Sequence, residues 1–166
     1  GCGFGETLNP ETKSRFNEGE GFILREYFLQ FITKVTTLEL EIPSMAIIAP
    51  YREQARYLSS LFQEDPDLIT YQDHIAINSV DAFQGQERDV IIISLTRSND
   101  QAEIGFLSDY RRMNVALTRA KKHLVVIGDS ATLGSDEFYG SLFQYFESIN
   151  SYRSVFEEMG QMDLQG

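Results

Sequence analysis

Two polar segments near the middle of the chain carry residue types suited to phosphate chemistry. Residues 79–89 read Ser-Val-Asp-Ala-Phe-Gln-Gly-Gln-Glu-Arg-Asp, and residues 111–121 read Arg-Arg-Met-Asn-Val-Ala-Leu-Thr-Arg-Ala-Lys. Each is followed closely by an apolar run, residues 90–93 and 124–127. Arginine is well suited to gripping phosphate, and ligands of open α/β sheets bind where strands end. The two segments therefore predict phosphate binding beside a sheet.

These segments resemble motifs V and VI of superfamily 1 helicases. The branch is the one that includes the helicase of nonsense-mediated mRNA decay and the DNA-replication helicase-nucleases. Those motifs belong to the second of two RecA-like domains, so the resemblance implies half a motor. Residues 49–56 resemble motif IV, and residues 1–6 resemble the entry into this domain in bacterial members. The resemblance covers most of residues 1–130 and is most specific over residues 79–130.

By this resemblance, motif V (79–89) joins the nucleotide to the nucleic acid. Gln84 and Gly85 form a turn at the interdomain cleft, and Glu87 matches the glutamate that bonds the nucleotide ribose. Ser79 and Asp81 fall where the motif reaches toward the nucleic-acid backbone. A plain β-turn with Glu87 in solvent is the alternative, but eleven contiguous matching residues favour motif V.

Motif VI (111–121) holds the residue with the sharpest predicted role. Arg119, in Ala-Leu-Thr-Arg-Ala, matches the arginine finger, which stabilises charge that develops on the γ-phosphate during transfer. Arg112, Asn114 and Thr118 are expected to position the motif, with Arg112 contacting motif V. On residue type alone, Arg119 would instead be an ordinary surface arginine.

Motif IV leaves alternatives open. Tyr51 either stacks on the adenine or packs at the edge of the core. Arg52 is expected to add a second positive charge near the phosphates, and Arg56, one helical turn later, competes for that role. Arg97 follows a buried strand and is expected either to contact a nucleic-acid phosphate or to brace the cleft.

The chain lacks the residues that hold nucleotide and metal in P-loop enzymes. It has no G-x-x-x-x-G-K-[S/T] sequence and no Gly-Lys pair, and no apolar strand ends in an acidic pair. ATP and Mg²⁺ are therefore expected only in a full-length enzyme, with Mg²⁺ held by a Walker A/B domain upstream. One cysteine and two separated histidines predict no zinc cluster, so no metal site is expected here.

Composition indicates a globular domain of unusual charge for a nucleic-acid motor. The 166 residues are 42% hydrophobic and carry a net charge of −11, which opposes broad attachment to nucleic acid. Five of the 14 basic residues fall within residues 111–122, so a local grip on phosphate survives. No apolar run is long enough to span a membrane. A cytoplasmic location and a monomeric fragment are expected.

Hydrophobic periodicity predicts alternating helices and strands. Asn17 and Glu20 form a capping-box-like pair before the first helix. The first 16 residues are expected to form a loop, and Tyr152, Val155, Phe156 and Met159 a last short helix. The expected helices are 18–36, 52–64, 111–121 and 140–149. The expected strands are 45–49, 74–80, 89–95 and 123–127, of which all but 74–80 are expected to be buried. This order predicts one α/β domain, a three-layer αβα RecA-like fold with a mainly parallel sheet.

The leading functional hypothesis is the C-terminal motor domain of an ATP-dependent superfamily 1 helicase. Its partners would be single-stranded DNA or RNA and the N-terminal RecA-like domain of the same polypeptide. The motifs do not choose between DNA and RNA, because they contact backbone common to both. The competing hypothesis is a stand-alone RecA-like scaffold for protein interactions, without ATPase activity. Arg119 and Glu87 favour the motor, because a scaffold has no need of an arginine finger.

Overall fold

Four parallel strands form the centre of the molecule. The structure, a computed structural model, describes residues 4–83, 85–154 and 157. The strands lie in the order β4-β3-β5-β6, so the chain starts near the middle and builds outward in both directions. The elements are β1 (Thr7–Leu8), β2 (Arg15–Phe16), α1 (Glu18–Thr37), β3 (Met45–Ile48), α2 (Arg52–Glu64), η1 (Ile69–His74), β4 (Ile75–Asn78), η2 (Val80–Phe83), β5 (Arg88–Ser94), η3 (Gly105–Ser108), α3 (Tyr110–Leu117), β6 (Ala120–Ile127), α4 (Ser130–Leu133) and α5 (Glu137–Ser148).

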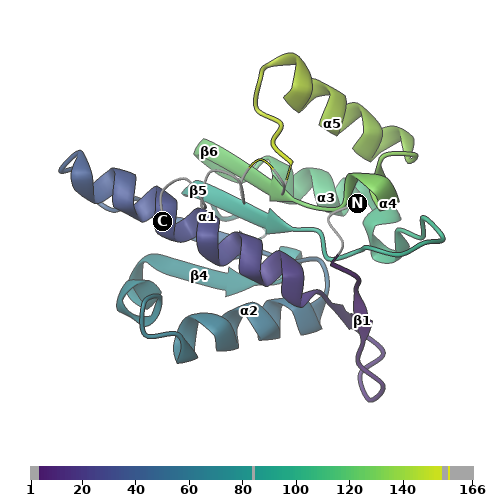
Figure 1. The fold of residues 1–166 in the computed structure, drawn as a ribbon, viewed down its shortest axis with the longest axis horizontal. Helices are drawn as coiled ribbons and strands as arrows, with labels where there is room; N and C mark the ends of the chain where they lie inside the picture. The colour runs from purple at the N-terminus through teal and green to yellow at the C-terminus, as the bar shows by residue number, and fades with distance from the viewer. Residues whose placement is uncertain (1–3, 84, 155–156, 158–166) are drawn as a thin grey trace.

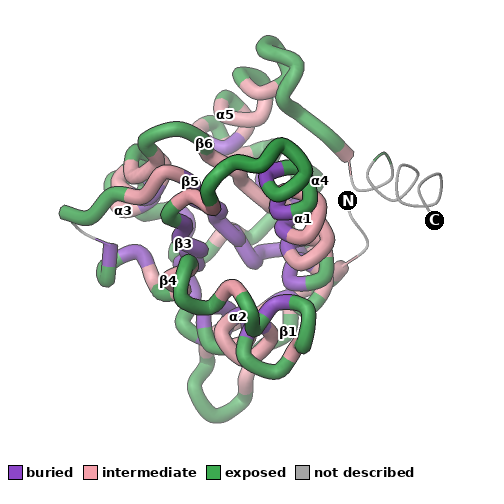
Figure 2. The backbone as a smooth tube through the Cα atoms, turned by 90° about the vertical axis from the view of Figure 1, so that its left-hand side faces the viewer, coloured by how far each residue is buried: buried purple, intermediate pink, exposed green. Residues whose placement is uncertain are grey.

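The two faces of the sheet are covered by different helices (Figure 1). Alternate residues of β3 and β5 point to opposite faces, as strand geometry requires. One face packs against α1 and α2, and the other against η2, α3, α4 and α5. Both central strands are thus buried on both faces, and Figure 2 shows them as buried segments inside the more exposed helices. The predicted three-layer α/β fold with a parallel sheet is confirmed.

Helix α1 begins with a side-chain cap, but the predicted capping box is wrong. Asn17 accepts the Glu20 N–H through Oδ1 at 3.1 Å, as an N-cap does. The Glu20 carboxyl does not return to the Asn17 N–H. That N–H donates to Gln54 Oε1 at 2.7 Å, while the Glu20 carboxyl enters the interior and accepts from Ser94 Oγ at 3.1 Å.

Three other expectations need correction. The predicted N-terminal loop contains the β1–β2 hairpin, whose turn is closed by Asn9 Oδ1 accepting two backbone N–H groups (Figure 1). The helix predicted over 111–121 ends at Leu117, because the chain must turn to pair β6 with β5. Strand β6 is longer than expected and is an edge strand, exposed over Lys121–His123. Most of the predicted last helix lies outside the described residues.

Within the described ranges, no helix combines the length and the apolar character that crossing a bilayer requires.

A buried carboxyl group lies where α1 begins. Glu20 is 2% exposed, and its Oε2 has no hydrogen-bond partner among the described residues. The pKa of Glu20 is raised to about 8, chiefly by burial and also by the nearby Asp129 carboxylate, against hydrogen bonds that favour the charged form. Burial also acts on Asp129, but hydrogen bonds from Ser98, Thr132 and the Ala131 N–H hold its pKa below the ordinary value. Glu20 is therefore neutral beside a charged Asp129.

Glu20→Gln should stabilise the domain increasingly as pH rises. A raised native pKa means that the favourable contribution of protonated Glu20 is complete below about pH 4.5 and is lost progressively as pH rises from there to about 8. Glutamine stays neutral, so we expect little change in the free energy of unfolding at pH 5 and an increase of about 1–3 kcal/mol at pH 9. Urea denaturation at both pH values measures this. The exposed Glu18→Gln serves as the control, and a pH-independent effect of Glu20→Gln would contradict the assignment.

Candidate nucleotide and nucleic-acid edges

Parallel strands separate the predicted site residues into two groups. Glu87 and Arg119 precede β5 and β6 and so lie at the amino edge of the sheet. Arg52 and Arg97 follow β3 and β5 and lie at the carboxyl edge. Strand β5 has seven residues, so the two edges are about 20 Å apart at about 3.3 Å per residue.

At the amino edge, motifs V and VI meet through the backbone. The Arg88 N–H donates to the Arg119 carbonyl oxygen at 3.2 Å, and Arg88 pairs with Ala120 in the sheet register. Glu87 is exposed, and Arg119 is partly exposed. The structure therefore brings the predicted ribose-binding and arginine-finger positions to adjacent points on one edge.

The Arg119 side chain is anchored to its own helix end. Its Nε donates to the Val115 carbonyl at 3.1 Å, and its Nη2 to Thr118 Oγ1 at 3.4 Å. Thr118 Oγ1 in turn donates to the carbonyls of Asn114 and Val115, which terminates α3. These bonds hold one side of the guanidinium and leave Nη1 without a hydrogen bond to any described residue, so it can donate to a phosphate oxygen from outside this domain.

Arg112 contacts motif V as predicted. Its Nη2 lies 3.0 Å from Asp81 Oδ2, which joins α3 to η2. The Asp81 side chain is still 73% exposed, so its predicted place near a nucleic-acid backbone stays a prediction. Asn114 faces a surface groove of about 620 Å³ between α3 and α5.

Gly85 adopts a backbone conformation that favours glycine. Its φ is +75°, and a side chain built there would meet no atom within 4 Å. The glycine is needed for the turn itself, and the space beside it is open to an incoming group. Gln84, predicted to share this turn, lies outside the described residues.

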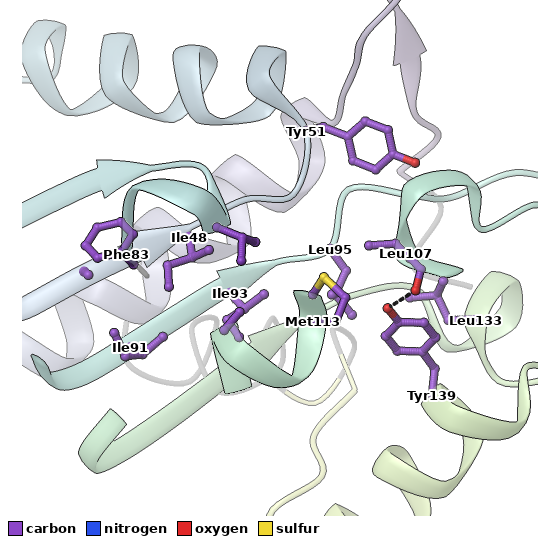
Figure 3. Close-up of a cluster of buried hydrophobic side chains, with 13 residues drawn as sticks. Ile48, Tyr51, Phe83, Ile91, Ile93, Leu95, Leu107, Met113, Leu133 and Tyr139 are labelled. Atoms are coloured by element: carbon purple, nitrogen blue, oxygen red, sulfur yellow. Dashed lines mark hydrogen bonds between the residues drawn. The ribbon is translucent and has the colours of Figure 1, made fainter. Parts of the chain in front are cut away.

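Tyr51 is packed in the core, so its predicted stacking on adenine is not supported. It is 3% exposed, and Figure 3 shows it at the margin of the apolar cluster of this face. Its hydroxyl accepts from the Phe106 N–H at 3.0 Å and from Arg97 Nη1 at 3.1 Å. Of the two roles left open for Tyr51, the core-edge role agrees with the structure.

The other basic residues of this edge also differ from expectation. Arg52 is exposed at the start of α2, and Arg56 pairs with Glu53 at 3.0 Å. Both belong to the helix that begins at the carboxyl edge. The prediction that one of them shares a phosphate with Arg119 therefore does not agree with the structure, because Arg119 lies at the amino edge. Arg97 is 3% exposed and is bound to Glu6 at 2.8 Å, which makes it an internal brace and not a nucleic-acid contact. Nothing local predicts this pair, because 91 positions separate its members.

A parallel sheet with helices on both faces defines an α/β fold of the RecA-like class. Comparison with known families agrees. The chain belongs to the family described as an AAA domain, which matches residues 3–131. Its relatives make it a domain of superfamily 1 helicase type.

Three of these relatives define the likeness. DNA-binding protein SMUBP-2 of Rattus norvegicus is 36% identical over 95% of this chain. DNA polymerase alpha-associated DNA helicase A of Saccharomyces cerevisiae is 40% identical over 78%, and Regulator of nonsense transcripts 1 of Dictyostelium discoideum is 43% identical over 70%. The chain spans 15%, 18% and 9% of their respective lengths.

Substitutions of Gly85 should separate backbone strain from steric conflict. Gly85→Ala meets no neighbour, so only its positive φ is unfavourable, and we expect a loss of about 1 kcal/mol of folding free energy. Gly85→Asn should lose less, because asparagine tolerates the left-handed region. Chemical denaturation measures both, with Gly5→Ala as an unstrained control. Equal stability of all three variants would contradict the strained turn.

Proposed function

We propose that this chain is the second RecA-like domain of an ATP-dependent superfamily 1 helicase. ATP would bind between this domain and a first RecA-like domain of the same polypeptide, which holds Mg²⁺. The observation that carries the proposal is the meeting of motifs V and VI at the amino edge, where the Arg88–Arg119 backbone bond sets Glu87 and the anchored Arg119 side by side.

The residues at this edge can add contacts to a bound nucleotide, but they do not form a complete nucleotide-binding site by themselves. Arg119 offers a positioned positive charge for the transferring phosphoryl group, and Glu87 a carboxylate for ribose hydroxyls. The described residues contain no cluster of three or more metal-ligating side chains. Because the sequence also has no phosphate-binding loop and no strand that ends in an acidic pair, we assign the binding of Mg²⁺ and of most of the triphosphate to the first domain.

The names of the relatives support a nucleic-acid substrate. One is called a DNA-binding protein and another a DNA helicase. We extend this to single-stranded DNA or RNA for the whole protein, acting in the cytoplasm. The alternative of a protein-interaction scaffold leaves the anchoring of Arg119 without a purpose.

Arg119→Ala, in the complete polypeptide that carries this domain, should abolish strand-stimulated ATP hydrolysis. The finger acts on charge that develops in the transition state, so kcat should fall by about a thousandfold or more, with a much smaller change in ATP affinity. Arg119→Lys should rescue poorly because it lacks the planar fork. Steady-state kinetics measure kcat, and the exposed Arg111→Ala in the same motif is the matched control. Near wild-type kcat in Arg119→Ala would remove the finger assignment.

The isolated chain of 166 residues should show no ATP turnover. It lacks a phosphate-binding loop and an acidic metal pair, so it cannot orient a triphosphate for attack. A coupled ATPase assay with and without single-stranded oligonucleotide tests this, and the Arg119→Ala variant of the same chain exposes contaminating activity. Hydrolysis that depends on both Arg119 and the oligonucleotide would show that the chain is a complete enzyme.

A further inference from the structure

Phe106 and Arg52 both border Tyr51 at the carboxyl edge, at the other end of the strands from the predicted nucleotide residues. We propose that they form a binding site for single-stranded nucleic acid, in which Phe106 stacks on a base and Arg52 contacts a phosphate. The inference rests on the proposed function, since it assumes that the whole protein engages a single strand. It replaces the predicted nucleotide role of Arg52 with a nucleic-acid role.

Phe106 is an aromatic side chain held out toward solvent. It is 60% exposed, although the neighbouring Leu107 is fully buried. Its ring leans on the buried Tyr51 ring, with 5.3 Å between ring centroids and 31° between planes. One aromatic surface is thus supported from below and the rest is open, which is the arrangement on which a nucleobase stacks.

The backbone beneath Phe106 is fixed. Gly105 has a φ of +53°, and a Cβ there would lie 2.0 Å from Arg97 Nη1 and 2.4 Å from Tyr51 Oη. The Phe106 N–H donates to the same Tyr51 hydroxyl, and Arg97 is held in place by Glu6. Because these contacts already order the loop, stacking a base on Phe106 would require little further loss of backbone entropy.

Arg52 is placed to neutralise a phosphate beside that base. It follows Tyr51 directly, is exposed, and makes no ion pair or hydrogen bond with any described residue. Ser79, the predicted backbone contact of motif V, follows β4 at the same edge, where the Ala49 N–H donates to the Asn78 carbonyl at 3.2 Å. A cation, a hydroxyl and an aromatic ring thus border one short stretch of this edge.

The position in the sheet agrees with a ligand site. After β3 the chain first builds β4 on one side and then β5 on the other, so the connections leaving β3 and β5 diverge at their carboxyl ends. Such a divergence is where open α/β sheets bind ligands. The loops that meet at this point are the ones that carry Tyr51–Arg52 and, farther along the chain, Phe106.

The charge around the pair predicts how binding will respond to salt. Glu103, in the same loop as Phe106, is 66% exposed, and the whole chain is acidic. Stacking and not electrostatic attraction should dominate, so affinity should fall only gently with salt. Arg52 alone should account for about 0.7 of the logarithmic slope, the value for one phosphate contact on a single strand.

The test uses the complete polypeptide without nucleotide, with short oligothymidylate and oligouridylate measured in parallel by fluorescence anisotropy. Phe106→Ala should weaken binding by about 5- to 150-fold, the loss of one stacked base. Phe106→Trp should restore it. Arg52→Ala should lower the salt slope by about 0.7. With 5-iodouracil in the oligonucleotide, photocrosslinking and mass spectrometry should identify Phe106.

Phe22, an exposed phenylalanine on α1, supplies the matched control as Phe22→Ala, which should bind like the wild type. The Phe106 site is overturned if Phe106→Ala binds as well as the wild type. It is also overturned if Phe106→Ala and the control Phe22→Ala weaken binding alike. In both cases the proposed function stands. Crosslinks that map only to other residues have the same meaning. If the wild type shows neither strand binding nor strand-stimulated hydrolysis, the proposed function fails and this inference fails with it. The melting temperature of Phe106→Ala shows whether this variant is folded. If it is not, binding by Phe106→Trp and the position of the crosslink decide whether Phe106 contacts a base.

Discussion

The hydrogen bonds between Asn17 and Gln54 are the interaction on which the arrangement of the carboxyl edge of the sheet depends. The Gln54 side-chain amide pairs with the Asn17 backbone through bonds of 2.7 and 3.1 Å, and its Nε2 also donates to Ser94. The Asn17 side chain begins α1 and donates to the Thr96 carbonyl at 3.1 Å. Two helices and the end of the central strand β5 are therefore fixed by a few fully buried amides, whose loss would leave unsatisfied polar groups in the core.

The two edges of the sheet present different side chains. At the amino edge, charged side chains lie on turns that are fixed by residues of motifs V and VI themselves. Gly85 adopts a positive φ in one turn, and Arg119 bonds the Val115 carbonyl in the other. At the carboxyl edge, the positive charge of Arg97 is paired with Glu6 inside the domain. It is therefore not available for the phosphate contact that the sequence suggested as one of its two roles. Phe106 and Arg52 stay exposed there, beside the exposed Glu103. The two edges therefore offer different groups: Glu87 and Arg119 at one, an aromatic ring and an arginine at the other.

Local patterns predicted what local forces decide. Helix α2 begins and ends at the predicted residues, and the continuous β-branched run over 89–95 forms β5 within one residue at each end. The errors fall where distant residues compete. Glu20 looked like half of a capping box until Gln54, from α2, took the Asn17 N–H. Tyr51 and Arg52 were grouped with Arg119 by family resemblance. They follow β3, whereas Arg119 precedes β6, so a parallel sheet places them at opposite edges.

Because the two edges are far apart, a small rotation about one edge moves the other edge by a larger distance. Residues packed into both faces make β3 and β5 a stiff element, with the amino and carboxyl edges about 20 Å apart. A rotation of about 10° about the amino edge would carry the carboxyl edge through about 3.5 Å, by the geometry of a rod about 20 Å long. Small closing movements at a phosphate would thereby become displacements of atomic size at Phe106, without any change inside the domain.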